Sequence, residues 1–129
     1  MQLTKVNYKD LNARQKENYN YHKVASALAD YGFNSMRLND DWQGADFISV
    51  NGDEMVKFQL KGRFTIDKKY IGKEIYIAFI EDQKVKIYNH DEAVSIIPDN
   101  IRNSDSWSKY GGYSWGKTPV RYGAIIKTI

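Results

Sequence analysis

The sequence lacks cysteine and contains only two histidines in 129 residues. The absence of cysteine excludes disulfide bonds, zinc sites built from thiolates, and cysteine nucleophiles. The two histidines, His22 and His90, lie far apart in the sequence, and neither has an acidic partner at a recognisable metal-ligand spacing. Zinc sites and histidine-led catalysis are therefore disfavoured. A Gly-x-Ser-x-Gly motif is also missing, so an acyl-transfer enzyme has no candidate nucleophile.

Long hydrophobic runs are absent as well. No apolar run approaches the roughly 20 residues that cross a membrane. Residues 1–5 do not contain the hydrophobic segment of a secretory signal. With 42% hydrophobic and 27% charged residues, the composition is that of a folded globular protein. We therefore expect a soluble, cytoplasmic protein with no membrane partner, folded as a single domain over residues 1–129.

Charges of one sign gather in successive segments, although the net charge is only +3. Acidic residues dominate residues 37–56, basic residues dominate residues 57–73, and basic and aromatic residues alternate after residue 102. An enzyme that cuts phosphodiesters with a metal ion needs such a distribution, because acids hold the cation while bases and rings hold the nucleic acid. Charge alone, however, favours an alternative in which these residues form solvated strand faces around a tyrosine-rich core.

The hydrophobic pattern predicts one long helix and several strands. Asn12 and Gln15 can form a capping box that begins a helix, which ends near Asp30, before Gly32. Strands are expected over residues 33–38, 45–50, 54–61, 74–81 and 84–88, a helical turn or two over residues 91–97, and a strand or helix over residues 123–128, with loops between. These elements predict a single α/β domain with helices flanking a mixed sheet.

A tight hairpin turn at Asn51-Gly52 predicts how two of these strands pair. In that register Asp46 lies opposite Lys57, and Gln59 is its diagonal neighbour. Because side chains alternate along a strand, Asp46, Gln59 and Lys61 share one face, while the apolar residues of both strands share the other. The pairing that gathers the apolar residues therefore also gathers these polar ones.

Glu17 lies one helical turn before Tyr21, in line with the apolar stripe of the expected helix. One interpretation is that its carboxylate faces the sheet, where a cation or hydrogen bonds must compensate its burial. The alternative is that Glu17 lies in the solvated first turns, where water and the helix dipole stabilise it. The sequence leaves both open.

Asp46 in Gly44-Ala45-Asp46-Phe47, followed after a hairpin by Gln59-Leu60-Lys61, resembles the motif of the PD-(D/E)XK nucleases. The resemblance is strongest to the Mrr-like branch of this superfamily, in which glutamine replaces the second acid. Glu17 on the preceding helix, and Asp40 and Asp41 before the glycine, also fit. The resemblance covers residues 12–90 and implies the restriction-endonuclease-like fold, with an αβββαβ core and a mixed central sheet flanked by helices.

The resemblance implies an Mg²⁺- or Mn²⁺-dependent endonuclease that hydrolyses phosphodiester bonds of DNA, with RNA not excluded and a homodimer possible. Asp46, Gln59 and the Leu60 carbonyl would hold the metal, Glu17 would bind it through a water or hold a second ion, and Lys61 would assist the attacking water. Residues expected to contact nucleic acid are Lys57, Arg63, Lys68, Lys69, Trp107 and Trp115.

Three alternatives remain. The absence of a proline-aspartate pair and the presence of Gln59 depart from the commonest family motif, and Gln59 is compatible with an inactive module that binds nucleic acid or a protein. The loop over residues 107–122 could instead serve protein interaction, although tryptophans such as Trp107 and Trp115 more often close a small core. Residues 111–118 match the P-loop pattern, but without a preceding buried strand and a following helix we interpret the match as coincidental.

Overall fold

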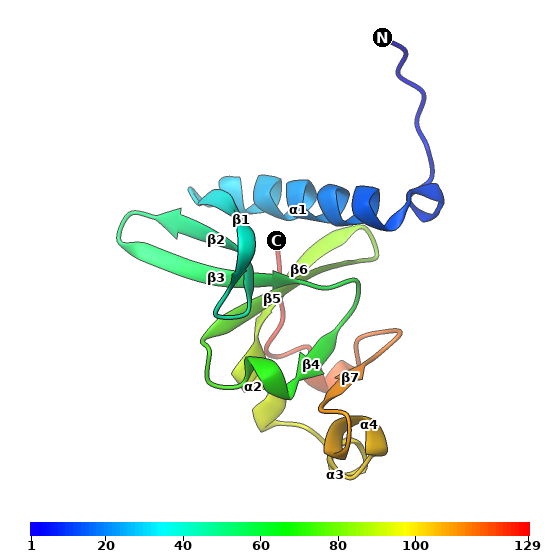
Figure 1. Ribbon diagram of the computed structural model, residues 1–129, viewed down its shortest axis with the longest axis vertical. Coiled ribbons are helices and arrows are strands. Elements are labelled where there is room, and N and C mark those ends of the chain that lie inside the picture. The colour runs from blue at the N-terminus through cyan, green and yellow to red at the C-terminus, as the bar shows by residue number, and fades with distance from the viewer.

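The computed structural model describes residues 1–129 and is built around a six-stranded sheet of order β1-β2-β3-β5-β6-β8 (Figure 1). Its strands are β1 (Asn34–Trp42), β2 (Ala45–Asn51), β3 (Glu54–Leu60), β5 (Ile75–Glu81), β6 (Lys84–Asn89) and β8 (Lys127–Thr128). The β3–β5 pair is parallel and the other pairs are antiparallel. The prediction of an α/β fold with a mixed central sheet flanked by helices is confirmed.

Different elements cover the two faces of the sheet (Figure 1). One face packs against the long helix α1 (Ala13–Ala29). The other is covered by a small two-stranded sheet of β4 (Thr65–Asp67) and β7 (Gly112–Ser114), together with short helices. These helices are α2 (His90–Ser95), α3 (Asp99–Arg102) and α4 (Asp105–Ser108), with 3-10 helices η2 (Lys68–Tyr70) and η3 (Val120–Tyr122). A further 3-10 helix, η1 (Tyr8–Asp10), directly precedes α1. The expectation of a loop after residue 98 is therefore wrong, because short elements form there around the core.

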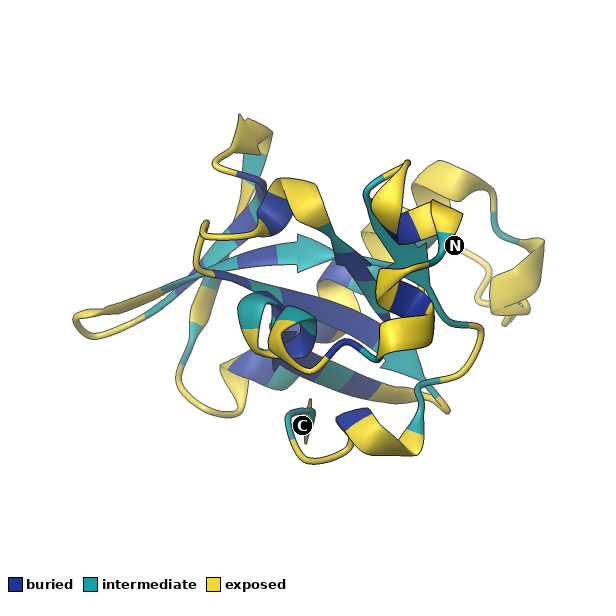
Figure 2. Cartoon of the chain, turned by 90° about the horizontal axis from the view of Figure 1, so that it is seen from below, coloured by how far each residue is buried: buried dark blue, intermediate teal, exposed yellow.

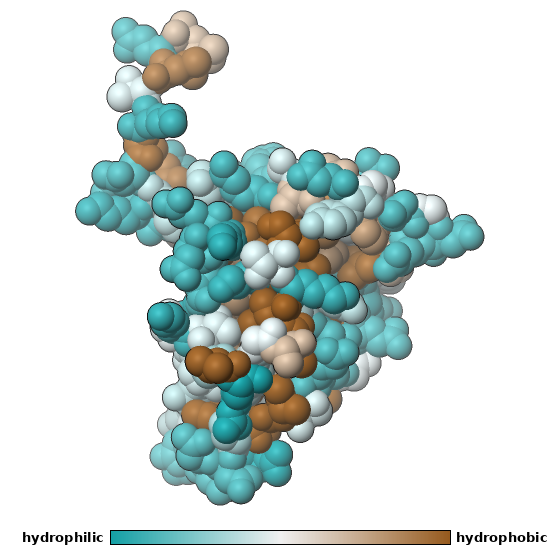
Figure 3. Space-filling model, turned by 180° about the vertical axis from the view of Figure 1, so that it is seen from behind, coloured by the Kyte–Doolittle hydropathy of each residue, from teal (hydrophilic) through white to brown (hydrophobic).

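Helix α1 begins and ends as its sequence predicts. The side chain of Asn12 accepts from the backbone of Gln15, and the side chain of Gln15 accepts from the backbone of Asn12, which completes the capping box. Its buried stripe consists of Tyr21, Val24 and Leu28, which are spaced to share one face. The first residues of the chain, before η1, extend away from the domain and are exposed (Figure 3).

The β2–β3 hairpin differs from its predicted register. Asn51 pairs with Glu54, so Gly52 and Asp53 form the turn. Gly52 has a φ of 60° at the first central position, as a type II′ turn requires, whereas the predicted Asn51-Gly52 turn needs positive φ at both residues. Lys57 consequently pairs with Ile48 and not with Asp46. Opposed residues still share a face, so the predicted division between polar and apolar faces is unchanged.

The connection between the parallel strands β3 and β5 covers part of the face opposite α1. It passes through β4 and the 3-10 helix η2 where an αβββαβ order has a helix. The hydroxyl of Tyr88, on β6, joins β4 to the main sheet by accepting from the Thr65 N–H at 3.0 Å and donating to the Thr65 carbonyl. One phenol thus satisfies both backbone groups of a residue in the small sheet.

Two apolar cores lie on opposite faces of the main sheet, and the buried residues concentrate along its central strands (Figure 2). The core under α1 contains Tyr21, Val24, Leu28, Phe47, Phe58, Ala78, Val85 and Ile87. The core on the other face contains Phe64, Ile66, Tyr70, Ile75, Ile77, Phe79, Tyr88, Ala93, Ile97, Ile101, Trp107 and Tyr122. Alternate residues of β5 supply both cores, as expected for a strand buried on both faces.

Candidate functional site

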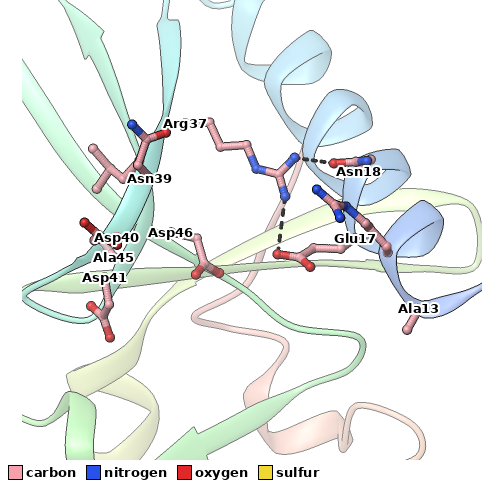
Figure 4. Close-up of a pocket in the computed structure, with 11 residues that line it drawn as sticks. Ala13, Glu17, Asn18, Arg37, Asn39, Asp40, Asp41, Ala45 and Asp46 are labelled. Carbon is pink, nitrogen blue, oxygen red and sulfur yellow. Dashed lines mark hydrogen bonds and ion pairs between the residues drawn. The ribbon is translucent and has the colours of Figure 1, made fainter.

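A polar cavity of about 680 Å³ opens between the start of α1 and the strands β1 and β2. Four carboxylates line it, from Glu17 on α1, Asp40 and Asp41 at the end of β1, and Asp46 on β2. Arg37 on β1 extends across the cavity toward α1 (Figure 4). The acidic residues predicted as candidates therefore meet in one concave place, as ligand sites usually do.

The carboxylate of Asp46 is held by a backbone hydrogen bond from the neighbouring strand. Its Oδ2 accepts the backbone N–H of Leu60 at 2.9 Å, which ties β2 to the end of β3. Burial raises the pKa of Asp46, and the charges of Glu17 and Asp41 raise it further. The Leu60 N–H and the charge of Lys61 act in the opposite direction and do not cancel the effect. Such a carboxylate gains from a nearby cation.

Gln59 and Lys61 lie on the side of β3 that carries Asp46. The last recorded pair of the hairpin is Phe47 with Phe58, so Asp46 faces Gln59 one step further along. Lys61 follows β3 directly, and its ammonium lies 5.2 Å from the centroid of the Tyr70 ring. That ring belongs to the core on the face opposite α1. Leu60, predicted to offer its carbonyl to a metal, also contributes its N–H to Asp46.

Glu17 combines features of both interpretations that the sequence left open. It points toward the cavity (Figure 4), yet its side chain is 61% exposed. Its Oε1 accepts from Arg37 Nη2 at 3.3 Å, and Arg37 also donates to Asn18 and lies 5.1 Å from the Tyr21 ring centroid. Sequence reasoning missed Arg37 as a site residue, although it is the one base among the acids of residues 37–56.

The turn between β1 and β2 brings the aspartates of residues 40–46 together. Asp41 accepts the backbone N–H of Gly44 through Oδ1 at 2.6 Å. Gly44 has a φ of 83°, and a Cβ at this position would lie 2.7 Å from Ile75 Cδ1 and 3.1 Å from Tyr70 Cδ1. Glycine is therefore required both for the backbone conformation and for close packing beneath Asp46.

The residues predicted to contact nucleic acid lie in different environments. Arg63, Lys68 and Lys69 are exposed on the β3–β5 connection. Lys57 is half-buried, donates to Gln43 Oε1 at 2.9 Å and lies near the exposed ring of Trp42. All four cations remain candidates, because each belongs to the strand or connection adjoining the Asp46 face.

The two tryptophans, Trp107 and Trp115, pack in or against a core, which was the alternative to contact with nucleic acid. Trp107 is only 6% exposed and belongs to the core, so its prediction as a contact for nucleic acid is wrong. A short helix, α4, turns its indole inward. Trp115 is half-buried and packs on Phe64 and Tyr122, with ring centroids 5.2 and 5.4 Å away. Their burial shows that aromatic residues after residue 102 mainly build the second core.

His90 and the P-loop-like segment have structural roles. His90 is fully buried, its Nε2 accepts the Asp67 N–H at 3.0 Å, and burial lowers its pKa, so the ring is neutral at pH 7. His22 is exposed on α1. Residues 111–118 form β7 and a loop that is followed by η3, and Thr118 donates to Glu81 through both its N–H and its hydroxyl. This arrangement is not the strand–loop–helix of a phosphate-binding loop.

The donor set for a metal ion is sparse. No three histidine, aspartate or glutamate side chains converge closely enough to hold one. The oxygens available on the Asp46 side are its own Oδ1, the Gln59 amide oxygen and, across the cavity, the carboxylate that Glu17 shares with Arg37. No helix of the chain has both the length and the apolar character needed to cross a membrane.

Comparison with known proteins gives a likeness of fold and no match of sequence. Neither a protein-family model nor a curated protein sequence matches the chain. The fold is similar to that of Hjc, a Holliday junction resolvase from the archaeal hyperthermophile Archaeoglobus fulgidus, with a TM-score of 0.43 and 13% sequence identity. The match covers 53% of this chain and 74% of the resolvase. The functional proposals below therefore rest on the geometry of the chain's own residues.

Proposed function

We propose that the chain is a metal-dependent endonuclease that hydrolyses phosphodiester bonds of DNA. One observation carries this proposal: Asp46, Gln59 and Lys61 lie on one face at the ends of two adjacent strands, and Asp46 also lines an open polar cavity. An acid, an amide oxygen and an ammonium group on one face can hold a divalent cation and a phosphate together. The sequence motif that resembles the PD-(D/E)XK nucleases supports the same assignment.

The chemistry of the donor set fits Mg²⁺ or Mn²⁺. Both ions favour oxygen ligands, and Mg²⁺ in proteins is usually held by one or two carboxylates while it keeps several waters. Asp46 and Gln59 would hold the ion directly, and Glu17 would bind through a water once it leaves Arg37. A bound ion would supply charge that stabilises the phosphate in its transition state and lowers the pKa of a water. The raised pKa of Asp46 shows that its charged form is unfavourable in the folded chain, and a bound cation would stabilise that form.

The chain's own residues account for the remaining roles. Leu60 N–H fixes the orientation of the Asp46 carboxylate and leaves Oδ1 without a hydrogen-bond partner in the protein. Lys61 would donate to the attacking water or to a phosphate oxygen, because its ammonium forms no ion pair or hydrogen bond within the protein. Lys57, Arg63, Lys68 and Lys69 would contact neighbouring phosphates along the same side.

The test is cleavage of a supercoiled plasmid with Mg²⁺ or Mn²⁺. We expect Asp46→Ala and Lys61→Ala to lose metal-dependent nicking, while Lys84→Ala, which removes an exposed lysine from β6, cuts as the wild type does. Each protein is purified in parallel and its melting temperature is measured. Equal residual cutting in all four proteins would identify a contaminating nuclease and would overturn the proposal.

A second candidate function is a module that binds nucleic acid without cutting it. The neutral Gln59 favours this function, because it replaces the second acid and removes one negative charge from the metal site. The ion pair between Glu17 and Arg37 also favours the binding module, because it occupies a carboxylate that a metal ion would need. This candidate predicts salt-dependent binding of DNA without turnover in either metal.

The variant Gln59→Glu separates the two candidates. For an active enzyme, the added carboxylate should shift the preference from Mn²⁺ toward Mg²⁺ with modest change in the maximum rate. For a binding module, wild-type protein should show no cutting, and Gln59→Glu should be the form that gains it. Absence of both cutting and DNA binding at low salt would exclude both candidates.

A further inference from the structure

The aromatic ring beneath Lys61 suggests how this lysine is held in place. A lysine side chain has many accessible rotamers, so an unrestrained Lys61 would seldom occupy one position. Other half-buried lysines of the sheet are fixed by hydrogen bonds: Lys57 donates to Gln43 at 2.9 Å, and Lys86 donates to Glu81 at 2.8 Å. Lys61 differs, since its ammonium contacts a ring and no acceptor.

Tyr70 is itself rigidly packed. It is only 4% exposed and sits at the end of η2, which Asp67 caps by accepting the Lys69 N–H at 2.9 Å. One edge of its ring lies against Gly44, where there is no space for a Cβ. The ring of the fully buried His90 meets it at an angle of 84° with centroids 5.5 Å apart.

Tyr70 also lies on the Asp46 side of the sheet. Burial raises the pKa of the Tyr70 phenol, and the charge and hydrogen bond of Lys69 act in the opposite direction. The charge of Asp46 is a smaller influence that raises this pKa, so Asp46 lies within electrostatic reach of the ring. Gly44, two residues before Asp46, touches the same ring. The ring is thus next to both the lysine and the acid of the candidate site.

We propose that Tyr70 is a positioning residue, whose buried ring holds the Lys61 ammonium beside Asp46 while leaving its three N–H donors free for a substrate. A hydrogen-bond acceptor in the same place would occupy one of those donors. A ring attracts the cation through its electron-rich face without doing so. This inference rests on the proposed nuclease function for the role of Lys61, but the Tyr70–Lys61 contact itself is independent of that function.

The contact is tested by NMR on the full chain with ¹³C-labelled lysine, using Lys61→Arg to assign the Lys61 signal. Protons over an aromatic face are shifted upfield, so the ε-methylene signal of Lys61 should lie upfield of free lysine. It should stay there in Tyr70→Phe, which keeps the ring, and move to the free-lysine position in Tyr70→Leu. A Lys61 signal that is unshifted in wild type, or unmoved in Tyr70→Leu, would overturn the inference.

The positioning role is tested by plasmid cleavage with the same variants. We expect Tyr70→Phe to retain the wild-type rate and Tyr70→Leu to lose about 2- to 30-fold in kcat with KM little changed. Because Tyr70→Leu also weakens a core, Val24→Ala provides a control that weakens the other core without touching Lys61. If Val24→Ala at matched stability loses as much rate, or if Tyr70→Phe loses as much as Tyr70→Leu, the role of the ring is excluded.

The two tests separate the failure of this inference from the failure of the proposed function. If Asp46→Ala leaves cutting unchanged, the nuclease function fails, and the positioning role fails with it, whatever the NMR signal shows. If Asp46→Ala and Lys61→Ala abolish cutting but Tyr70→Leu does not reduce it, only the inference about Tyr70 fails.

Discussion

The two faces of the β2–β3 hairpin have opposite character, although alternate residues of the same strands form them. On the face toward α1, Phe47 and Phe58 stack with ring centroids 4.9 Å apart and planes 4° from parallel. Asp46 and Gln59 lie on the other face, and Asp46 also lines the polar cavity that opens toward the start of α1. Neighbours in the chain thus differ because Phe47 and Phe58 pack in the core under α1, whereas the carboxylate of Asp46 lines an open cavity.

This contrast shows how an apolar core can position a polar site. Burial of Phe47 and Phe58 fixes the pairing of the strands, and the pairing then fixes where Asp46 and Gln59 meet. A shift of the strand pairing by one residue would turn the phenylalanines to the opposite face. The packing under α1 therefore specifies the geometry of the polar residues as well. The polar residues need not stabilise the fold to be held accurately.

The largest effect should come from breaking the apolar face. Phe47→Ala removes a fully buried ring and should lower the free energy of unfolding by about 3–5 kcal/mol. Its neighbour Asp46→Ala should cost much less, because the lost hydrogen bond to the Leu60 N–H is offset by removal of a carboxylate whose burial is unfavourable. Urea unfolding of both variants measures the difference. Similar destabilisation by the two would contradict the division of roles between the faces.

The next effect concerns the polar face alone. Lys61→Met keeps most of the side-chain volume but removes the charge, and it should reduce metal-dependent cleavage about 10²- to 10³-fold, as loss of a transition-state donor commonly does. Stability should change little, since the ammonium forms no ion pair. Steady-state cleavage rates together with melting curves test both parts. An active Lys61→Met protein would show that Lys61 has no part in the chemistry.

A smaller effect should follow where the two sides of the comparison meet, at the turn into β2. Gly44→Ala should cost about 1–3 kcal/mol, because alanine at a φ of 83° is strained and its Cβ would collide with Ile75 and Tyr70. Gly52→Ala is a matched control, with a φ of 60° and open space around it. The destabilisation in excess of that control measures the collision, and equal losses would show that only backbone strain matters.

The smallest expected effect is a pH-dependent change in stability at Asp46, on the polar face. Asp46→Asn should raise the free energy of unfolding at pH 7 by about 0.5–2 kcal/mol, as stabilising changes at functional sites often do. The pKa of Asp46 is raised above 3.8 in the folded chain, so the unfolded chain loses its proton first as pH rises, and the wild type loses stability through that interval.

The gain in Asp46→Asn is therefore complete above the folded pKa of Asp46 and vanishes below pH 3.8, where both states of the wild type are protonated. Urea unfolding in the presence of EDTA, at pH 3 and at pH 7, measures it without interference from metal. A gain that is larger at pH 3 than at pH 7 would show that burial does not raise the pKa of Asp46.

Much of the fold was predictable from local signals. The capping box at Asn12, the stripe of α1 and the alternating strands all depend on neighbours in the sequence, and all were predicted. The predicted β2–β3 turn lies one residue too early. Asn-Gly favours a type I′ turn over Asn51 and Gly52, whereas the observed pairing forms a type II′ turn over Gly52 and Asp53. The short helices after residue 98 were missed, since their stability comes from packing on the second core.

The candidate site was predictable only in part. Asp46, Gln59 and Lys61 were found because strand alternation carries them to one face. Arg37 and Tyr70 were missed, because their contacts join distant segments: Arg37 reaches α1 from β1, and Tyr70 reaches Lys61 from η2. Trp107 was assigned to the surface because charge patterning cannot distinguish an exposed ring from a buried one.

The double hydrogen bond of Tyr88 has a consequence for how the protein opens. The Thr65 amide on β4 is protected by a side chain of β6, and not by a partner in its own small sheet. Its exchange with deuterated solvent should therefore occur only when β6 releases the phenol, together with the amides of the main sheet. The Tyr88 hydroxyl thus links local opening of the β3–β5 connection, which carries the basic residues, to unfolding of the main sheet.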